Sequence, residues 1–143
     1  MRRVLQSAAV ALALALAGAA AAGPDQDYML YCMGCHGSEA RGVPGKIPPL
    51  AGSLARFMST PDGRDYVLRV PGAASSALSD AQLAAVLNWL AMRYPAAEER
   101  PPAPFTAEEV ARVRRTPLAN VQERRREVIR GLAASGVAPP AGY

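Results

Sequence analysis

Hydrophobic positions along the chain recur mainly with the spacing of α-helices. The clearest case is residues 79–94, SDAQLAAVLNWLAMRY, where apolar side chains at three- and four-residue intervals form one stripe. The stripe consists of Leu83, Val86, Leu87 and Leu90. Ser79 and Gln82 have the spacing of a capping box, in which each side chain accepts a hydrogen bond from the backbone N–H of the other residue. We therefore expect a helix over this range.

Two shorter helices are expected earlier in the chain. Residues 24–32, PDQDYMLYC, open with two aspartates, and acidic groups stabilise a helix N-terminus. Thr60 and Pro61 are a favourable N-cap and first helical residue. The helix that they begin should end near Arg69, because Pro71 disfavours helical geometry at the residue before it.

The last third of the chain has a proline-rich stretch followed by two amphipathic stretches. Residues 95–105 predict a linker. Thr106 and Glu109 have capping-box spacing at the start of AEEVARVRR, and Pro117 separates this helix from a second one over PLANVQERRREVIRGLAAS. The apolar stripe of the second helix comprises Leu118, Val121, Val128 and Leu132. Together the patterns predict an all-α protein with a two-helix C-terminal tail.

The N-terminal residues 1–22 combine a basic start, an apolar run and a row of small residues. This layout is typical of a secretory signal peptide, with cleavage after Ala22. The alternative is an uncleaved membrane anchor, because the apolar run is almost long enough to span a bilayer. The run is rich in alanine and contains Gln6 and Ser7, which favours cleavage and a periplasmic mature protein.

Composition excludes two broad classes of protein. The chain has 143 residues, of which 50% are apolar and 20% charged, so it is neither disordered throughout nor a polytopic membrane protein. Its length suits one small domain with extensions. Residues 23–94 carry six basic and six acidic side chains, and the tail carries eight basic and six acidic ones. This small excess, together with export, argues against binding to nucleic acid.

Residues 31–42, YCMGCHGSEARG, contain both cysteines of the chain and its only histidine. Cys32, Cys35 and His36 form a C-x-x-C-H motif. A disulfide between the two cysteines would close a very small loop and constrain the unfolded chain little. A thioredoxin-like pair belongs in a βαβ unit, and no strand pattern surrounds the motif. A structural zinc site needs about four nitrogen or sulfur ligands, of which the chain offers three.

C-x-x-C-H is also the signature of covalent haem attachment. Each thiol adds to one haem vinyl group and becomes a thioether, and the histidine that follows lies where it can ligate the iron. Attachment takes place in the exported compartment, which agrees with the N-terminal segment. We therefore predict one covalent haem c, bound through Cys32 and Cys35, with His36 as the proximal axial ligand.

With this motif the chain resembles the small class I c-type cytochromes. A short helix precedes the motif, a glycine- and proline-rich loop, GSEARGVPGKIPPLAG, follows it, and a closing helix ends the unit. The resemblance covers about residues 25–94 and implies a small cytochrome c-like fold around the haem. The chain then divides into a signal peptide (1–22), a haem domain (23–94) and a linker with a helical extension (95–143). Tyr28 matches the aromatic position of the family's first helix.

The loop contains PPLAG, which matches the family pattern Pro-x-Leu-x-Gly at Pro48, Leu50 and Gly52. The resemblance implies that the Pro48 carbonyl accepts a hydrogen bond from the proximal imidazole. Such a bond fixes the ring and raises its basicity as a ligand. Stiffening of the loop by its prolines is an alternative role, and both can hold.

The sixth iron ligand is the main departure from the family. The family's distal loop carries a methionine, whereas the corresponding segment here, VPGAASSAL, has none. His36 is the only histidine, so ligation by two histidines of one chain is excluded. Met58 is the candidate distal ligand, with a filler role beside Phe57 as its alternative. An open or water-occupied position, or a less usual ligand, is a further alternative.

The function that follows from the resemblance is electron transfer. A buried haem with fixed axial ligands changes its iron charge with little rearrangement. We expect a carrier rather than an enzyme: either a shuttle between periplasmic redox proteins, or the cytochrome subunit of a dehydrogenase or oxidase. The alternative is a five-coordinate haem module that binds or senses a gas. A peroxidase would want a distal acid–base group, and no second histidine is available for that role.

The tail and the arginines of the core have several interpretations. The tail helices could cover the core and shield the haem, dock onto a larger redox partner, or present a basic face to an acidic partner or a membrane surface. Contact with a membrane is not required for the carrier role. Arg41, Arg56 and Arg64 could pair with haem propionates through charge complementarity.

Overall fold

The computed structural model describes residues 22–96, 101–138 and 140, so the expected signal peptide lies outside the described residues except for Ala22. The described part consists of helices joined by loops, and its only β-type pairing is an isolated bridge between Val43 and Ile47. This confirms the prediction of an all-α protein. Within the same ranges no helix is both long enough and apolar enough to cross a membrane.

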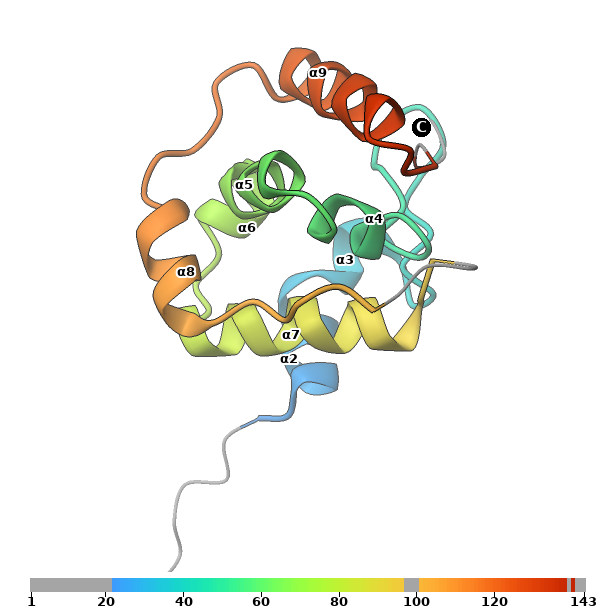
Figure 1. The fold of residues 1–143 in the computed structure, drawn as a ribbon. Helices are drawn as coiled ribbons and strands as arrows, with labels where there is room; N and C mark the ends of the chain where they lie inside the picture. The colour runs from blue at the N-terminus through green and yellow to red at the C-terminus, as the bar shows by residue number, and fades with distance from the viewer. Residues whose placement is uncertain (1–21, 97–100, 139, 141–143) are drawn as a thin grey trace, which may run out of the picture.

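The helices of the described part pack together, with the closing helix running below α4 and α5 and above α2 in the view of Figure 1. In chain order they are α2 (Pro24–Tyr31), α3 (Met33–His36), α4 (Leu54–Met58), α5 (Pro61–Arg69), α6 (Pro71–Ala74), α7 (Asp80–Arg93), α8 (Ala107–Val113) and α9 (Val121–Ala134). Of these, α2, α5, α7, α8 and α9 correspond to helices that the sequence pattern predicts. The short helices α4 and α6 were not predicted, because pieces of four or five residues depend on tertiary packing rather than on periodicity.

The predicted start of α7 is present in full. The Ser79 side chain accepts a hydrogen bond from the Gln82 backbone N–H at 3.2 Å, and the Gln82 side chain accepts one from the Ser79 N–H at 3.1 Å. At the start of α5, the Thr60 hydroxyl accepts a bond from the Gly63 N–H at 3.2 Å. The same helix ends at Arg69, and Val70 has extended backbone geometry, as the following proline requires.

The predicted capping box at the start of α8 is only half formed. The Thr106 hydroxyl accepts a hydrogen bond from the Glu109 N–H at 3.2 Å. The Glu109 carboxylate, however, binds the guanidinium of Arg64 on α5. A charged partner from another helix has replaced the local backbone partner, since an ion pair with two hydrogen bonds is stronger than one bond to a neutral N–H.

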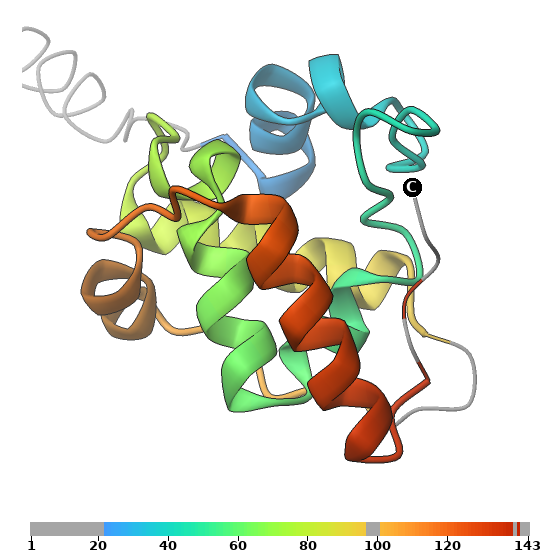
Figure 2. The same cartoon turned by 90° about the horizontal axis from the view of Figure 1, so that it is seen from above.

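Helices α2 and α7 pack against each other, with α2 at the edge of the molecule (Figures 1 and 2). Tyr28 of α2 and Trp89 of α7 meet at this interface with ring centroids 5.7 Å apart and an interplanar angle of 44°. The Gln82 side-chain amide donates a hydrogen bond of 3.1 Å to the Asp27 carboxylate, which is buried. The interface therefore combines an aromatic contact with a polar link between the two helices.

Helices α4 and α5 pack closely because a glycine lies between them. A Cβ atom on Gly63 would lie 2.0 Å from the carbonyl oxygen of Phe57, far inside a van der Waals contact. The close approach lets Phe57 and Tyr66 stack at a centroid distance of 5.2 Å, and both side chains are buried. Any larger residue at position 63 would force the two helices apart.

The C-terminal tail folds back along the helical core, with α8 against α7 and α9 against α5 (Figures 1 and 2). Its anchoring side chains are fully buried, and they are Phe105, Val110, Val128 and Leu132. Asn88 of α7 makes two hydrogen bonds with the backbone of Phe105, at 2.9 and 2.8 Å. The apolar stripe of the tail packs onto the chain's own core, which is one of the roles considered for the tail.

Candidate functional site

The C-x-x-C-H motif lies at the junction of α2 and α3. Cys32 breaks the helix between them, with φ −126° and ψ −37°, and its carbonyl accepts a hydrogen bond from the His36 N–H at 3.0 Å. The two thiols are free; Cys32 is half-buried and Cys35 is exposed. Burial is the main cause that raises the pKa of the Cys32 thiol, with Asp27 and Cys35 adding to it. The Cys32 thiol is therefore protonated near neutral pH, and both thiols are free for addition to a substituent of a bound group.

The His36 ring is fixed by the loop that follows the motif. Its Nδ1 atom lies 3.1 Å from the carbonyl oxygen of Pro48. A carbonyl can only accept, so Nδ1 carries the hydrogen and Nε2 keeps its lone pair. Burial lowers the pKa of His36, and the Pro48 bond opposes this only in part. The ring is thus neutral near pH 7, which is the form that binds a metal ion.

The loop holds Pro48 in place through a tight backbone turn. The Gly42 N–H donates to the His36 carbonyl at 2.8 Å, and Gly42 itself has φ +67°. A Cβ on this glycine would lie 2.2 Å from the Ile47 carbonyl oxygen. Gly42 is therefore required twice, for its left-handed backbone and for the close approach of the two arms of the loop.

Tyr28 connects this loop to the first helix. Its hydroxyl donates a hydrogen bond of 2.6 Å to the Gly37 carbonyl. Desolvation by burial raises the pKa of Tyr28 to about 12, so the hydroxyl remains a donor at any physiological pH. The aromatic residue that the sequence placed in the first helix thus also supports the turn after His36.

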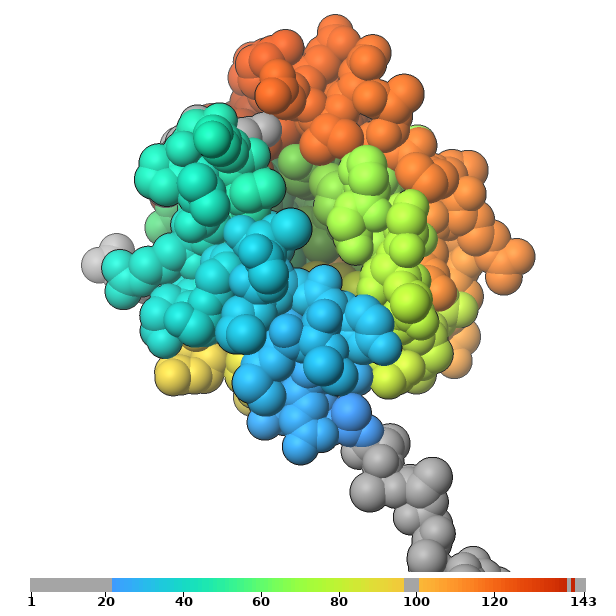
Figure 3. All heavy atoms as spheres, turned by 180° about the vertical axis from the view of Figure 1, so that it is seen from behind, coloured from blue at the N-terminus to red at the C-terminus, as the bar shows by residue number. Residues whose placement is uncertain are grey.

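The surface beside the motif is hollowed (Figure 3). The motif, the loop that follows it, the segment around α6 and helix α9 surround this hollow, and the loop and the α6 segment lie on opposite sides of it. The bordering segments carry partly buried apolar side chains that pack on the core, among them Met33, Leu50, Val70 and Ala73. An apolar hollow next to two free thiols and a neutral imidazole suits a flat, largely apolar group that is bound covalently.

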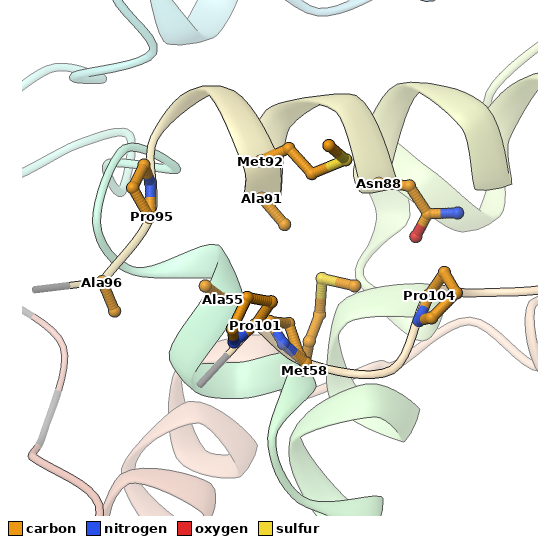
Figure 4. Close-up of a pocket in the computed structure, with 10 residues that line it drawn as sticks. Ala55, Met58, Asn88, Ala91, Met92, Pro95, Ala96, Pro101 and Pro104 are labelled. Carbon is orange, nitrogen blue, oxygen red and sulfur yellow. The ribbon is translucent and has the colours of Figure 1, made fainter. Parts of the chain in front are cut away.

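The structure does not bring Met58 to this hollow. Met58 is buried and lines a separate pocket of about 360 Å³ between α4, the end of α7 and the proline-rich segment. Figure 4 shows its side chain rising from α4 towards Ala91 and Met92 of α7, beside Pro101 and Pro104. The residues of the C-x-x-C-H motif and Pro48 do not line this pocket.

The arginines considered for haem propionates have different surroundings. The Arg64 guanidinium binds the carboxylate of Glu109 and the carbonyls of Ala103 and Pro104. Its central carbon also lies 4.2 Å from the ring centroid of Phe105. The expectation for Arg64 is therefore wrong, because its guanidinium is already occupied.

The other two arginines differ in exposure, and Arg56 is half-buried. Arg56 donates to the Ala138 carbonyl near the C-terminus at 3.4 Å. Arg41 is exposed on the loop that follows the motif.

Sequence reasoning missed one residue of this region. Asp27 is 2% exposed, five positions before Cys32, with the Gln82 amide as its partner. In the sequence it looked like an acidic residue at a helix N-terminus. Its burial could not be predicted locally, because its partner Gln82 is 55 residues away along the chain.

No protein-family model matches the chain. Among curated proteins, two relatives are each 36% identical to it over 110 residues: cytochrome c-552 of Thermus thermophilus, and cytochrome c-552 of one particular strain of the same species. The aligned region covers 64% of this chain, and 84% of the first relative and 74% of the second. The likeness therefore extends over most of each relative rather than over one motif.

Proposed function

Because the chain belongs to the c-type cytochromes, we propose that it carries single electrons between redox proteins outside the cytoplasm. Its cofactor is covalent haem c, and proteins of this family are electron carriers rather than enzymes. The observation that carries the proposal is the hydrogen bond from His36 Nδ1 to the Pro48 carbonyl, next to two free thiols of a C-x-x-C pair.

The described residues suit a covalently bound haem. Cys32 and Cys35 would hold the haem as thioethers, and His36 would bind the iron through Nε2. The haem supplies an iron that changes between the ferrous and ferric states. In support of this assignment, both thiols are unpaired and the apolar hollow adjoins them.

The chain's own residues keep the site rigid while the iron charge changes. The Pro48 carbonyl orients the imidazole and increases its electron donation. Gly42 and Tyr28 hold the loop that carries this carbonyl. A site that does not reorganise can pass an electron with a low barrier.

Residues 95–143 support the haem unit rather than form a separate module. Their apolar side chains pack against α5 and α7, so the face with the motif remains for contact with a partner protein.

We assign residues 23–94 to the haem domain and residues 1–22 to export. The partner is a redox protein, such as a dehydrogenase or oxidase in which this chain acts as the cytochrome subunit, or another carrier for which it acts as a shuttle. Contact with a membrane is not needed for this role.

The proposal is tested by producing the full chain in a host that attaches haem to exported cytochromes. The intact mass should equal the chain from Gly23 plus one haem, and the visible spectrum should change reversibly on reduction and oxidation. The double variant Cys32→Ser with Cys35→Ser is the matched control and should carry no covalent haem. A wild-type mass of bare polypeptide, with both thiols reactive, would contradict the proposal.

A further inference from the structure

The described chain offers few side chains that could bind the iron opposite His36. The protein ligands used at haem iron are imidazole, thiolate, thioether and phenolate groups. Both cysteines and the single histidine belong to the C-x-x-C-H motif. Lys46, the only lysine of the sequence, lies in the same loop as Pro48, whose carbonyl accepts the hydrogen bond from His36. The methionines and tyrosines of the described residues remain to be considered.

The segment across the hollow from that loop contains small residues. It runs from Val70 to Leu78 and includes α6. Its sequence, VPGAASSAL, has only serine hydroxyls as polar side-chain groups, and the Ser76 hydroxyl already accepts a bond from the Leu78 N–H at 3.3 Å. This segment therefore gives no thioether, imidazole or phenolate to the hollow.

The methionines lie elsewhere in the described structure. Met58 and Met92 line the pocket between α4, α7 and residues 101–104 (Figure 4). In Figures 1 and 2 this proline-rich segment runs along one side of α7, whereas α2 and α3 lie on the other side. Met33 lies inside the motif, and Met29 is half exposed on α2, one turn before it.

The described tyrosines have other roles. Tyr28 donates to the Gly37 carbonyl at the turn after His36. Tyr66 is buried against Phe57 in the core, and Tyr94 ends α7 with the Arg93 guanidinium 5.2 Å from its ring. Tyr31 lies next to Cys32 and is half exposed.

We propose that His36 is the only axial ligand that the described residues supply, and that the side of the haem facing residues 70–78 binds a small uncharged diatomic molecule such as carbon monoxide or nitric oxide. This inference rests on the proposed function, because it needs haem attached at Cys32 and Cys35. The ligand class follows from the chemistry of the site. Small side chains such as Gly72, Ala73 and Ala74 leave room for a few atoms, and ferrous iron binds ligands that accept electron density.

The same segment also indicates what happens to a bound ligand. Residues 70–78 contain no side chain that could act as a general acid or base near neutral pH. Cleavage of a bound peroxide requires such a group, whereas reversible binding does not. The site therefore favours reversible occupation over catalysis.

Ligand binding and reduction of the iron would each shift the equilibrium of the other, because coupling between two equilibria is reciprocal. A ligand that binds the ferrous form more tightly than the ferric form makes the haem easier to reduce. For a one-electron centre, each tenfold preference corresponds to about 59 mV. The chain would then respond to the ligand through its reduction potential.

The experiment uses the mature haem-loaded protein, reduced under nitrogen and mixed with carbon monoxide. We expect a high-spin five-coordinate spectrum before mixing and a rapid shift to a carbon monoxide complex after it. Met58→Leu, with Met92→Leu as its matched control, should leave both the spectrum and the rate unchanged. Ala73→Met adds a thioether to the segment across the hollow and should slow association by at least about tenfold, if this segment faces the iron.

Two results would overturn the inference in different ways. A haem-loaded wild type that is low-spin and six-coordinate, and that does not take up carbon monoxide, overturns this inference but leaves the proposed function intact. If Met58→Leu then converts it to a high-spin form, Met58 is the ligand after all. A purified chain whose mass lacks haem overturns the inference and the proposed function together.

Discussion

Arg64 on α5 and Glu109 on α8 form a bidentate ion pair, with Nε–Oε1 and Nη2–Oε2 distances of 2.8 and 2.5 Å. Their side chains are only 16% and 20% exposed. The Arg64 guanidinium also donates to the Ala103 carbonyl at 2.7 Å and lies over the ring of Phe105. One side chain of the core thus holds the beginning of the tail through four different contacts.

The first prediction concerns this pair. Arg64→Ala should lower the free energy of unfolding by about 2–4 kcal/mol, because it leaves a partly buried carboxylate and two carbonyls without their donor. The haem spectrum should be retained, since Arg64 lies in the tail contact. Urea unfolding of the holoprotein measures the effect. Arg126→Ala, which removes an exposed arginine of α9, is the control and should change the same quantity by less than about 0.5 kcal/mol. Equal losses in the two variants would show that the pair has no special role.

A second prediction follows from the acidity of Glu109. The hydrogen bonds from Arg64 are the largest cause that lowers the pKa of Glu109. A carboxyl group with a lowered folded-state pKa stabilises the protein fully above its unfolded pKa of about 4.3, and this contribution is lost as the pH falls through the folded value. The melting temperature of the wild type should therefore exceed that of Glu109→Gln at pH 7, and the gap should narrow below about pH 4. A gap that stays constant down to pH 3 would contradict the assignment.

The loop that orients His36 provides a third prediction with a close control. Gly42→Ala and Gly45→Ala both place a side chain on a left-handed backbone, which costs about 1–2 kcal/mol. Only the Cβ at position 42 meets other atoms, 2.2 Å from the Ile47 carbonyl oxygen and 2.7 Å from the Pro48 carbonyl oxygen. Gly42→Ala should therefore be the less stable of the two variants.

Gly42→Ala should also raise the reduction potential, because a displaced Pro48 carbonyl reduces electron donation by the imidazole. Thermal unfolding and a spectroelectrochemical titration measure the two effects. A shift of the potential that is as large in Gly45→Ala would mean that the effect does not pass through Pro48.

The fourth prediction concerns the buried carboxylate of Asp27. Asp27→Asn removes a negative charge near Cys32 while keeping the shape of the side chain. A buried negative charge stabilises ferric iron, so its removal should favour the reduced form and raise the reduction potential. Asp25→Asn on the same turn is exposed and should shift the potential much less. A redox titration in moderate salt compares the two, and similar shifts would argue against a role for burial.

Local patterns predicted most helices of this protein, but not its long-range polar contacts. Ser79 and Gln82 define the start of α7 because both partners lie within one turn. Glu109 has the same local spacing from Thr106, yet its carboxylate binds Arg64, 45 residues earlier in the chain. Periodicity does not reveal such a pair, and for the same reason Arg64 was considered as one of three arginines that could pair with haem propionates.

The candidate site, too, could be predicted only in part from the sequence. The motif and PPLAG pointed to His36 and Pro48, whose ring nitrogen and carbonyl lie 3.1 Å apart in the structure. Met58 was a tentative candidate, with a filler role and an open iron position as its alternatives. The direction of that side chain depends on α4, a five-residue helix positioned by its contacts with α5 and α7. No sequence signal for such a short helix was available, so the direction could not be predicted.

The way in which the tail packs determines when during biogenesis the molecule can close. Helices α8 and α9 rest on α5 and α7, so they can dock only after the earlier part of the chain has folded. Under the proposed export from the N-terminus, Cys32 and Cys35 would reach the attachment machinery before residues 106–138. Helix α9 borders the hollow, so its arrival would narrow access to the newly loaded cofactor. Haem loading before the docking of α8 and α9 is the order that this topology favours, and the docked tail would then hold the loaded core closed.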